Sequence, residues 1–237
     1  IVSRDKGSAM PALKATPEEH RDLIAFLAKL GGLKPGALPG PGDAISQASI
    51  DKVMHPKPGE WPTYNGLMSG NRYSDLDQIN LQNVSRLSMQ WAFTLPYFGL
   101  ETTPLGSDGV MYVTASWSVV HAIDARTGQR IWSYDPQVDK SKGFRGCCDV
   151  VNRGVALWQG KVYVGAYDGR LIALDAASGR VLWQKDTLID HARSYTITGA
   201  PRVFKGKVII GNGGAEYGVR GYVTAYDATT GDQKWRW

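Results

Sequence analysis

The chain has 237 residues, of which 43% are hydrophobic and 10% aromatic, and its formal net charge is +5. This composition is ordinary for a globular core and excludes a disordered chain. The sequence has no run of about twenty apolar residues, the length that a membrane-spanning helix needs. The lysines and arginines are scattered, which disfavours nucleic-acid binding and leaves an acidic protein partner open. The start has no signal-peptide pattern and no Met, and the last residue is an apolar indole, so we expect a segment of a longer protein.

A strong helix signal opens the chain. In TPEEHRDLIAFLAKL, Thr16 can cap the amino end and apolar residues follow at helical spacing. From Gly31 to Gly59, eleven of twenty-nine residues are Gly or Pro, a composition typical of an interdomain linker. We therefore predict three parts: a helical segment at 1–32, a linker at 33–58 and a further domain at 59–237.

The second part of the chain contains a repeat. Three segments share the pattern Ala-x-Asp-x-x-Thr/Ser-Gly-x-x-x-Trp, at intervals of 51 and 52 residues: AIDARTGQRIW (122–132), ALDAASGRVLW (173–183) and AYDATTGDQKW (225–235). A period near fifty, with several short strands in each unit, predicts a β-propeller in which each unit is one four-stranded blade. About three and a half units fit between Trp61 and Trp237, so we expect further blades beyond Trp237.

The repeated residues have structural interpretations. Each Gly stands where a tight turn needs a positive φ, and each Trp offers a flat surface to pack between neighbouring blades. Asp124, Asp175 and Asp227 are predicted to be turn residues rather than catalytic carboxylates, because they occur in every repeat and an active site is needed once.

The two cysteines of the chain are adjacent, in RGCCDVVNRG (145–154). Two cysteines alone make an incomplete zinc site, and a bond between neighbours would close too short a loop to stabilise the fold much. The pair could instead lie against something that reacts.

Three features together resemble the pyrroloquinoline quinone (PQQ) dependent dehydrogenases: WPTYNGLMSGNRYSDLDQINLQNVSRLSMQW (61–91), the Trp-docking repeats and GCCDVVNRG. The resemblance implies an eight-bladed propeller with the quinone on its axis. The vicinal cysteines favour the methanol and ethanol dehydrogenase type, in which the two form a disulfide over one face of the quinone. A disulfide also implies an oxidising compartment, consistent with the periplasm.

The resemblance assigns cofactor-binding roles residue by residue. Glu101, in LETTP, matches the carboxylate that hydrogen-bonds the quinone, and Cys147 and Cys148 match the disulfide. Arg153, in VNRG, matches the guanidinium that pairs with a PQQ carboxylate, a role that suits its planar fork of donors. Thr198, in TITGAP, matches a hydroxyl donor. Alone, each would be an ordinary loop residue; their order and local motifs give them their value.

A glycine-rich segment, GNGGAEYGVRGY (211–222), matches the loop that cradles the edge of the cofactor. Gly214 and Ala215 would allow close approach of the backbone, and Glu216 matches a metal-ligating carboxylate for calcium or a lanthanide. Gly213 departs from the pattern, because relatives often carry Ser there, so a hydroxyl contact is missing or replaced by backbone. Alone, GNGG would be read as a hairpin turn, and it is a poor dinucleotide fingerprint.

The front end carries a second resemblance. SAMPALKATPEEHRDLIAFLAKL is similar to the carboxy-terminal part of a class I cytochrome c, so residues 1–32 would be the remnant of such a domain and Met10 an axial ligand of haem iron. The Cys-x-x-Cys-His attachment motif is absent, so this chain by itself cannot hold haem c, which we expect in the parent protein.

The implied reaction is oxidation of an alcohol to an aldehyde or ketone, with electrons passed to a cytochrome c. The catalytic base and the other metal ligands are expected beyond Trp237, so no catalytic residue is assigned here and the chain alone is expected to be inactive. Two alternatives remain: a PQQ-dependent sugar or polyol dehydrogenase, and a non-catalytic propeller scaffold that binds proteins. A scaffold has no reason to keep the Cys pair, Arg153 and the Glu216 loop together.

Overall fold

The computed structural model describes residues 53–67, 69–96 and 99–237. Met10, the predicted helix that follows Thr16 and most of the predicted linker lie outside these ranges. All described residues belong to one unit, Asp43–Trp237. Within the described ranges, no helix combines the length and apolar character needed to cross a membrane.

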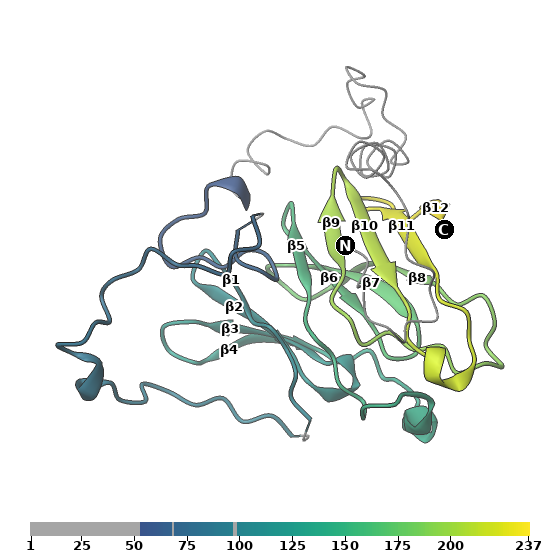
Figure 1. Cartoon of the computed structure of the whole chain (residues 1–237), viewed down its shortest axis with the longest axis horizontal. Helices are drawn as coiled ribbons and strands as arrows, with labels where there is room; N and C mark the ends of the chain where they lie inside the picture. The colour runs from purple at the N-terminus through teal and green to yellow at the C-terminus, as the bar shows by residue number, and fades with distance from the viewer. Residues whose placement is uncertain (1–52, 68, 97–98) are drawn as a thin grey trace, which may run out of the picture. The chain divides into compact units, whose positions relative to one another are not determined.

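In the described part of the chain, twelve strands form three four-stranded antiparallel sheets, each a meander in chain order. The first blade comprises β1 (Leu105–Ser107), β2 (Val110–Thr114), β3 (Val120–Asp124) and β4 (Arg130–Tyr134). The second comprises β5 (Ala156–Trp158), β6 (Lys161–Gly165), β7 (Arg170–Asp175) and β8 (Val181–Asp186). The third comprises β9 (Arg202–Phe204), β10 (Lys207–Gly211), β11 (Val223–Asp227) and β12 (Gln233–Arg236). Each sequence repeat therefore ends one blade, and the predicted propeller architecture is confirmed (Figure 1).

One short 3₁₀ helix, η1 (Val84–Arg86), precedes β1, and three lie in the connections between strands: η2 (Ser116–Ser118), η3 (Lys140–Arg145) and η4 (Ala215–Tyr217). Most of the described chain before β1 is irregular. Trp61 exchanges two backbone hydrogen bonds with Gly106, at 2.9 and 3.0 Å, and so adds a short bridge beside β1.

The repeated Asp closes the turn between the third and fourth strands of each blade. Oδ1 of Asp175 accepts hydrogen bonds from the amides of Ala177 (3.2 Å) and Ser178 (2.9 Å) and from the Ser178 hydroxyl (2.7 Å). The Ser178 hydroxyl bond, followed by the bond from the Ser178 amide, lowers the pKa of Asp175 because both favour the ionised carboxylate. Asp124 and Asp227 accept the corresponding amide bonds. The prediction that these aspartates are turn residues is confirmed.

A tryptophan on the fourth strand of one blade docks onto the turn of the next. Nε1 of Trp132 donates to the carbonyl of Ala176 at 2.9 Å, and the Trp132 ring lies where a Cβ on Gly179 would come within 2.6 Å. Gly179 has a φ of +73°, as the sequence predicts for this turn. The same contact recurs between the second and third blades, from Trp183 to Ala228 (3.3 Å). Trp91, in the irregular segment before β1, contacts the first blade in the same way, at the Ala125 carbonyl (3.1 Å).

Trp235 occupies the corresponding position in the third blade. Its Nε1 is buried and has no hydrogen-bond partner among the described residues. Buried polar groups are normally paired. Among the described residues, Trp235 therefore differs from its three counterparts in that its Nε1 binds no carbonyl.

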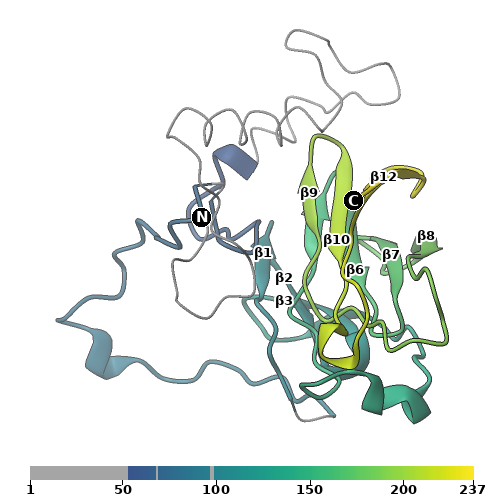
Figure 2. The ribbon, with the colours of Figure 1, turned by 45° about the vertical axis from the view of Figure 1, so that its right-hand side comes forward.

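Apolar side chains fill both sides of the middle sheet. Along β6, Val162 and Val164 belong to the cluster shared with the first blade, whereas Tyr163 belongs to the cluster shared with the third. All three are fully buried, because successive side chains of a strand point to opposite faces and each face has a neighbouring sheet. The Tyr163 hydroxyl also donates to the Ala228 carbonyl at 2.8 Å. Figure 2 shows the three sheets from a second direction.

A single added methyl group tests the docking contact. We expect Gly179→Ala to lower the free energy of unfolding by about 3 kcal/mol. The alanine backbone would have to keep a strained positive φ, and its Cβ would collide with the Trp132 ring. Gly160→Ala is the matched control: Gly160 has a φ of +69° and no atom lies within 4 Å of where its added methyl group would stand, so strain alone should cost about 1 kcal/mol. Equal losses in denaturant unfolding would contradict the docking role.

Candidate functional site

Three loops lead into the first strands of the three blades and carry most of the predicted site. We call residues 99–104, 146–155 and 187–201 the lead-in loops of β1, β5 and β9. Glu101, Arg153 and Thr198 lie near the ends of these loops, at most four residues before the strand. Because the blades stack in chain order, their lead-in loops are neighbours, and residues distant in sequence meet there.

The structure brings Glu101, Arg153 and Thr198 into one cluster. Nη2 of Arg153 lies 2.8 Å from Oε2 of Glu101, and Nη1 donates to the Thr198 hydroxyl at 2.7 Å. The Arg153 backbone is also held on both sides, because its amide donates to the Thr198 carbonyl (2.8 Å) and its carbonyl accepts from the Thr103 amide (3.2 Å). The three residues that the resemblance assigned to the cofactor are therefore in direct contact.

The ion pair in this cluster is only partly shielded. The side chains of Arg153 and Glu101 are 35% and 44% exposed. Ion pairs with this much exposure contribute little to stability, commonly about 1 kcal/mol or less. The ion pair therefore adds little to the stability of the fold.

Cys147 and Cys148 are bonded to each other, as the resemblance implies, and both are exposed. Their segment follows η3 and is held at several points. The Tyr217 hydroxyl, in η4, donates to the Gly146 carbonyl at 3.2 Å, and the Trp117 amide donates to the Val150 carbonyl at 2.9 Å. The disulfide is thus placed between the first blade and the glycine-rich loop.

The glycine-rich loop has the backbone that its sequence suggests. Gly214 has a φ of +111°, and a Cβ there would collide with the Ser194 carbonyl, so only glycine fits. Ala215 and Glu216, in η4, are exposed. The Gly213 amide donates to the Thr196 carbonyl at 2.7 Å, so it is already engaged within the protein and is not free to replace a missing serine hydroxyl.

The predicted metal role of Glu216 stays a prediction. Among residues 53–67, 69–96 and 99–237, no group of three or more His, Cys, Asp or Glu side chains comes together in a way that could hold a metal ion. Carboxylate oxygen is nevertheless the donor that calcium and similar hard cations prefer.

Sequence reasoning missed a buried polar network beneath the lead-in loops. Asn152 is 1% exposed and Ser118 is fully buried, and the two are hydrogen-bonded at 3.1 Å. The only local signal was that Asn152 directly precedes Arg153 in VNRG. Ser118 had no signal, because its contact joins residues 34 positions apart.

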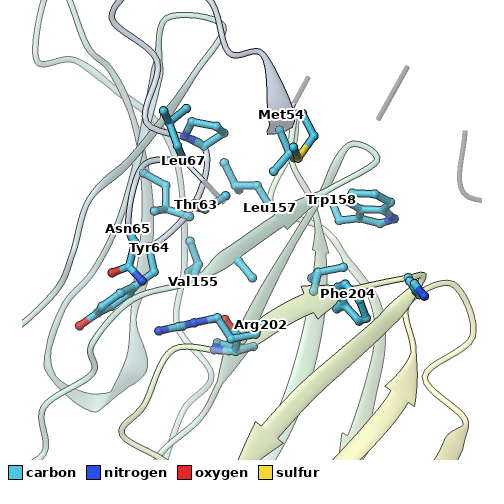
Figure 3. Close-up of a pocket in the computed structure, with 17 residues that line it drawn as sticks. Met54, Thr63, Tyr64, Asn65, Leu67, Val155, Leu157, Trp158, Arg202 and Phe204 are labelled. Atoms are coloured by element: carbon cyan, nitrogen blue, oxygen red, sulfur yellow. The ribbon is translucent and has the colours of Figure 1, made fainter. Parts of the chain in front are cut away.

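A separate apolar pocket of about 480 Å³ lies beside β5 and β9, and none of the predicted site residues lines it. Tyr64 and Leu67 lie on one side of it and Trp158 and Phe204 on another (Figure 3). Arg202 stacks over the Tyr64 ring, with its Cζ 4.3 Å from the ring centre. The predicted site residues therefore lie outside this pocket.

These features define the class of protein. Stacked four-stranded blades and tryptophans docked onto a turn of the neighbouring blade indicate a β-propeller domain, and its polar cluster at the lead-in loops is formed by several blades. Residues 61–237 match the family described as PQQ: Glucose/ethanol/alcohol dehydrogenase, beta-propeller domain, and the chain belongs to this family. The family expected from the sequence is confirmed.

Characterised relatives are similar over most of this chain. It is 66% identical to the quinohemoprotein alcohol dehydrogenase of Comamonas testosteroni over 179 residues. The aligned region covers 75% of this chain and 25% of that protein. It is 59% identical to the 1-butanol dehydrogenase (cytochrome c) of Thauera butanivorans over 172 residues. That alignment covers 72% of this chain and 25% of that protein. The chain therefore spans about a quarter of the length of these relatives.

Solved structures show the same likeness. The crystal structure of the Comamonas testosteroni quinohemoprotein alcohol dehydrogenase superposes with a TM-score of 0.76 at 62% identity, over 83% of this chain and 29% of that one. A europium-containing methanol dehydrogenase superposes with a TM-score of 0.75 at 40% identity, over 81% of this chain and 33% of that one.

The disulfide can be tested for a structural role. We expect the double variant Cys147→Ser, Cys148→Ser to lose only about 1 kcal/mol in free energy of unfolding, because a bond between adjacent residues removes little entropy from the unfolded chain. Denaturant unfolding of the oxidised parent and the variant gives the comparison. A loss of about 3 kcal/mol or more, typical of a bond closing a long loop, would make the pair a structural staple.

Proposed function

We propose that this chain is part of a PQQ-dependent dehydrogenase that oxidises alcohols to aldehydes or ketones and passes electrons to a cytochrome c. The observation that carries the proposal is the contact of Arg153 with Glu101 and Thr198 in a propeller of the PQQ family, in a chain whose β5 lead-in loop also holds the vicinal disulfide. Relatives that share more than half of their aligned residues with this chain are alcohol dehydrogenases by name, which supports alcohols over sugars as the substrate class.

The described residues fit an acidic, planar quinone. Arg153 already binds a carboxylate oxygen, that of Glu101, so its donors suit a carboxylate in this position. Thr198 adds a hydroxyl, and Gly214 brings a backbone without a side chain. The exposed disulfide offers a compact, polarizable surface for one face of the ring. A non-catalytic scaffold has no use for this combination.

In the proposed reaction the alcohol carbon loses a hydride and its hydroxyl loses a proton, and the quinone, when bound, supplies the two-electron acceptor for the hydride. Arg153, Thr198 and Glu101 bind and orient the cofactor, and Cys147 and Cys148 cover one of its faces. No described residue is assigned the step that takes the proton.

The metal, the haem and the compartment complete the proposal. Glu216 would contribute a carboxylate to calcium or a lanthanide, which favour the same hard oxygen donors. Met10 would be an axial ligand of haem c in the parent protein. A stable disulfide requires an oxidising compartment, and for this protein we propose the periplasm.

The cofactor claim can be tested on the full-length protein that carries this chain. We expect the cofactor-free protein to bind PQQ with calcium and the quinone absorbance to change when a primary alcohol is added. Arg153→Lys should raise the PQQ dissociation constant by about tenfold or more, because one ammonium cannot reproduce the two-nitrogen contacts of the guanidinium.

Arg180→Lys is the matched control, since Arg180 is exposed in the turn between β7 and β8 and lies outside the three lead-in loops. It should bind PQQ like the parent. A protein that shows no absorbance change with any alcohol would rule out the proposed function, and equal PQQ binding by the Arg153 variant would remove Arg153 from the site.

A further inference from the structure

A buried asparagine stands directly before the arginine of the candidate site. Nδ2 of Asn152 donates to the Gly165 carbonyl at 2.8 Å and to the Ser118 hydroxyl at 3.1 Å, and its Oδ1 accepts from the Gly154 amide at 3.0 Å. Both the nitrogen and the oxygen of the side-chain amide are therefore hydrogen-bonded, in a residue that is 1% exposed. Because Oδ1 binds the residue after Arg153, the Asn152 side chain bridges the backbone on either side of the guanidinium-bearing residue.

Ser118 is held in a conformation that favours glycine. Its φ is +62°, in the left-handed region. The turn between β2 and β3 closes with a bond from the Ala115 amide to the Val119 carbonyl, and the matching turn of the second blade closes from Ala166 to Arg170. In that alignment Ser118 corresponds to Gly169, whose φ is +89°. Serine therefore occupies a position where the other blade has glycine.

The Ser118 hydroxyl explains the exception. It accepts from Nδ2 of Asn152 at 3.1 Å and from the Tyr167 amide at 3.0 Å, so it joins the first blade to two segments of the second. Non-glycine residues in this region persist where the surroundings hold them there, and they concentrate near functional sites. Here the hydroxyl makes contacts that glycine could not.

The same network reaches the partner of Arg153. The Thr114 hydroxyl lies 3.1 Å from the Asn152 carbonyl and 2.9 Å from the Thr102 hydroxyl. Thr102 directly follows Glu101, just as Asn152 directly precedes Arg153. Each member of the ion pair is therefore adjacent in sequence to a residue that is anchored in the buried network.

We propose that Ser118 and Asn152 are positioning residues for Arg153: their hydrogen bond fixes the β5 lead-in loop against the first blade, so that the guanidinium is held ready for the cofactor carboxylate. The role toward PQQ rests on the proposed function. The fixing of the loop is a property of the chain itself and can be measured without cofactor.

Ser118→Gly separates positioning from stability. Glycine relieves the left-handed conformation while the hydroxyl is lost, so the variant should keep its fold and thermal midpoint close to those of the parent. We expect the PQQ dissociation constant of the full-length protein to rise about tenfold, as loss of one buried hydrogen bond allows. Amide hydrogen exchange at residues 152–154 of the cofactor-free protein should become faster.

Tyr163→Phe is the control for a purely structural effect. It removes the buried bond to the Ala228 carbonyl, away from the lead-in loop of β5, and should lower the thermal midpoint while leaving PQQ binding and exchange at 152–154 unchanged. Asn152→Ala, where it folds, should weaken PQQ binding more than Ser118→Gly, because it also leaves the Gly165 carbonyl and Gly154 amide unpaired.

The outcomes of the two proposals are distinguishable. Parent protein that binds PQQ, with a Ser118→Gly variant that binds it equally well, would overturn the positioning role while leaving the proposed function intact. Parent protein that does not bind PQQ would remove the proposed function. In that case the exchange measurement decides: unchanged rates at 152–154 in Ser118→Gly overturn the positioning role, and faster rates support it.

Discussion

The contact between a tryptophan ring and the glycine turn of the next blade determines the rest of this structure. At the junction of the first two blades, the Trp132 ring occupies the space that a side chain on Gly179 would need, and its Nε1 binds the carbonyl of the same turn. A flat ring with one donor fixes both the spacing and the register of two sheets. Because both junctions between the three blades make this contact, the blades follow one another regularly and their lead-in loops come together.

The site depends on that regularity but consists of what does not repeat. Turn aspartates, turn glycines and docking tryptophans recur in every described blade, whereas the lead-in loops read differently: LETTP before β1, VVNRGV before β5 and TITGAP before β9. One blade supplies a carboxylate, the next a guanidinium and the third a hydroxyl. The residues of the lead-in loops do not have to fit the packing between strands, and three of the candidate site residues, one from each loop, are found there.

Much of the fold could be predicted from the sequence, because its signals are local. The Asp175 turn and the positive φ of Gly179 follow from residue types within one short segment, and the period of the repeat predicts the blades. Glu101, Arg153 and Thr198 were found by resemblance, and the structure adds the direct contact of Arg153 with each of the other two. That contact joins residues about fifty positions apart, and no local pattern reports it.

Ser118 shows most clearly why the remainder was not predictable. A serine in a hairpin turn is ordinary in sequence, and only its left-handed backbone and its bonds to the second blade distinguish it. In the matching turn of the second blade, glycine adopts the left-handed backbone without strain. At Ser118 the bonds of the hydroxyl group hold serine in that conformation. Both turns hold the lead-in loop that follows: Gly169 does so through its backbone carbonyl, which accepts from the Thr187 amide and hydroxyl, whereas Ser118 does so through its side-chain hydroxyl. In a repeat protein, a residue that departs from the repeat and adopts a strained backbone indicates a position that is determined by the functional site rather than by the fold.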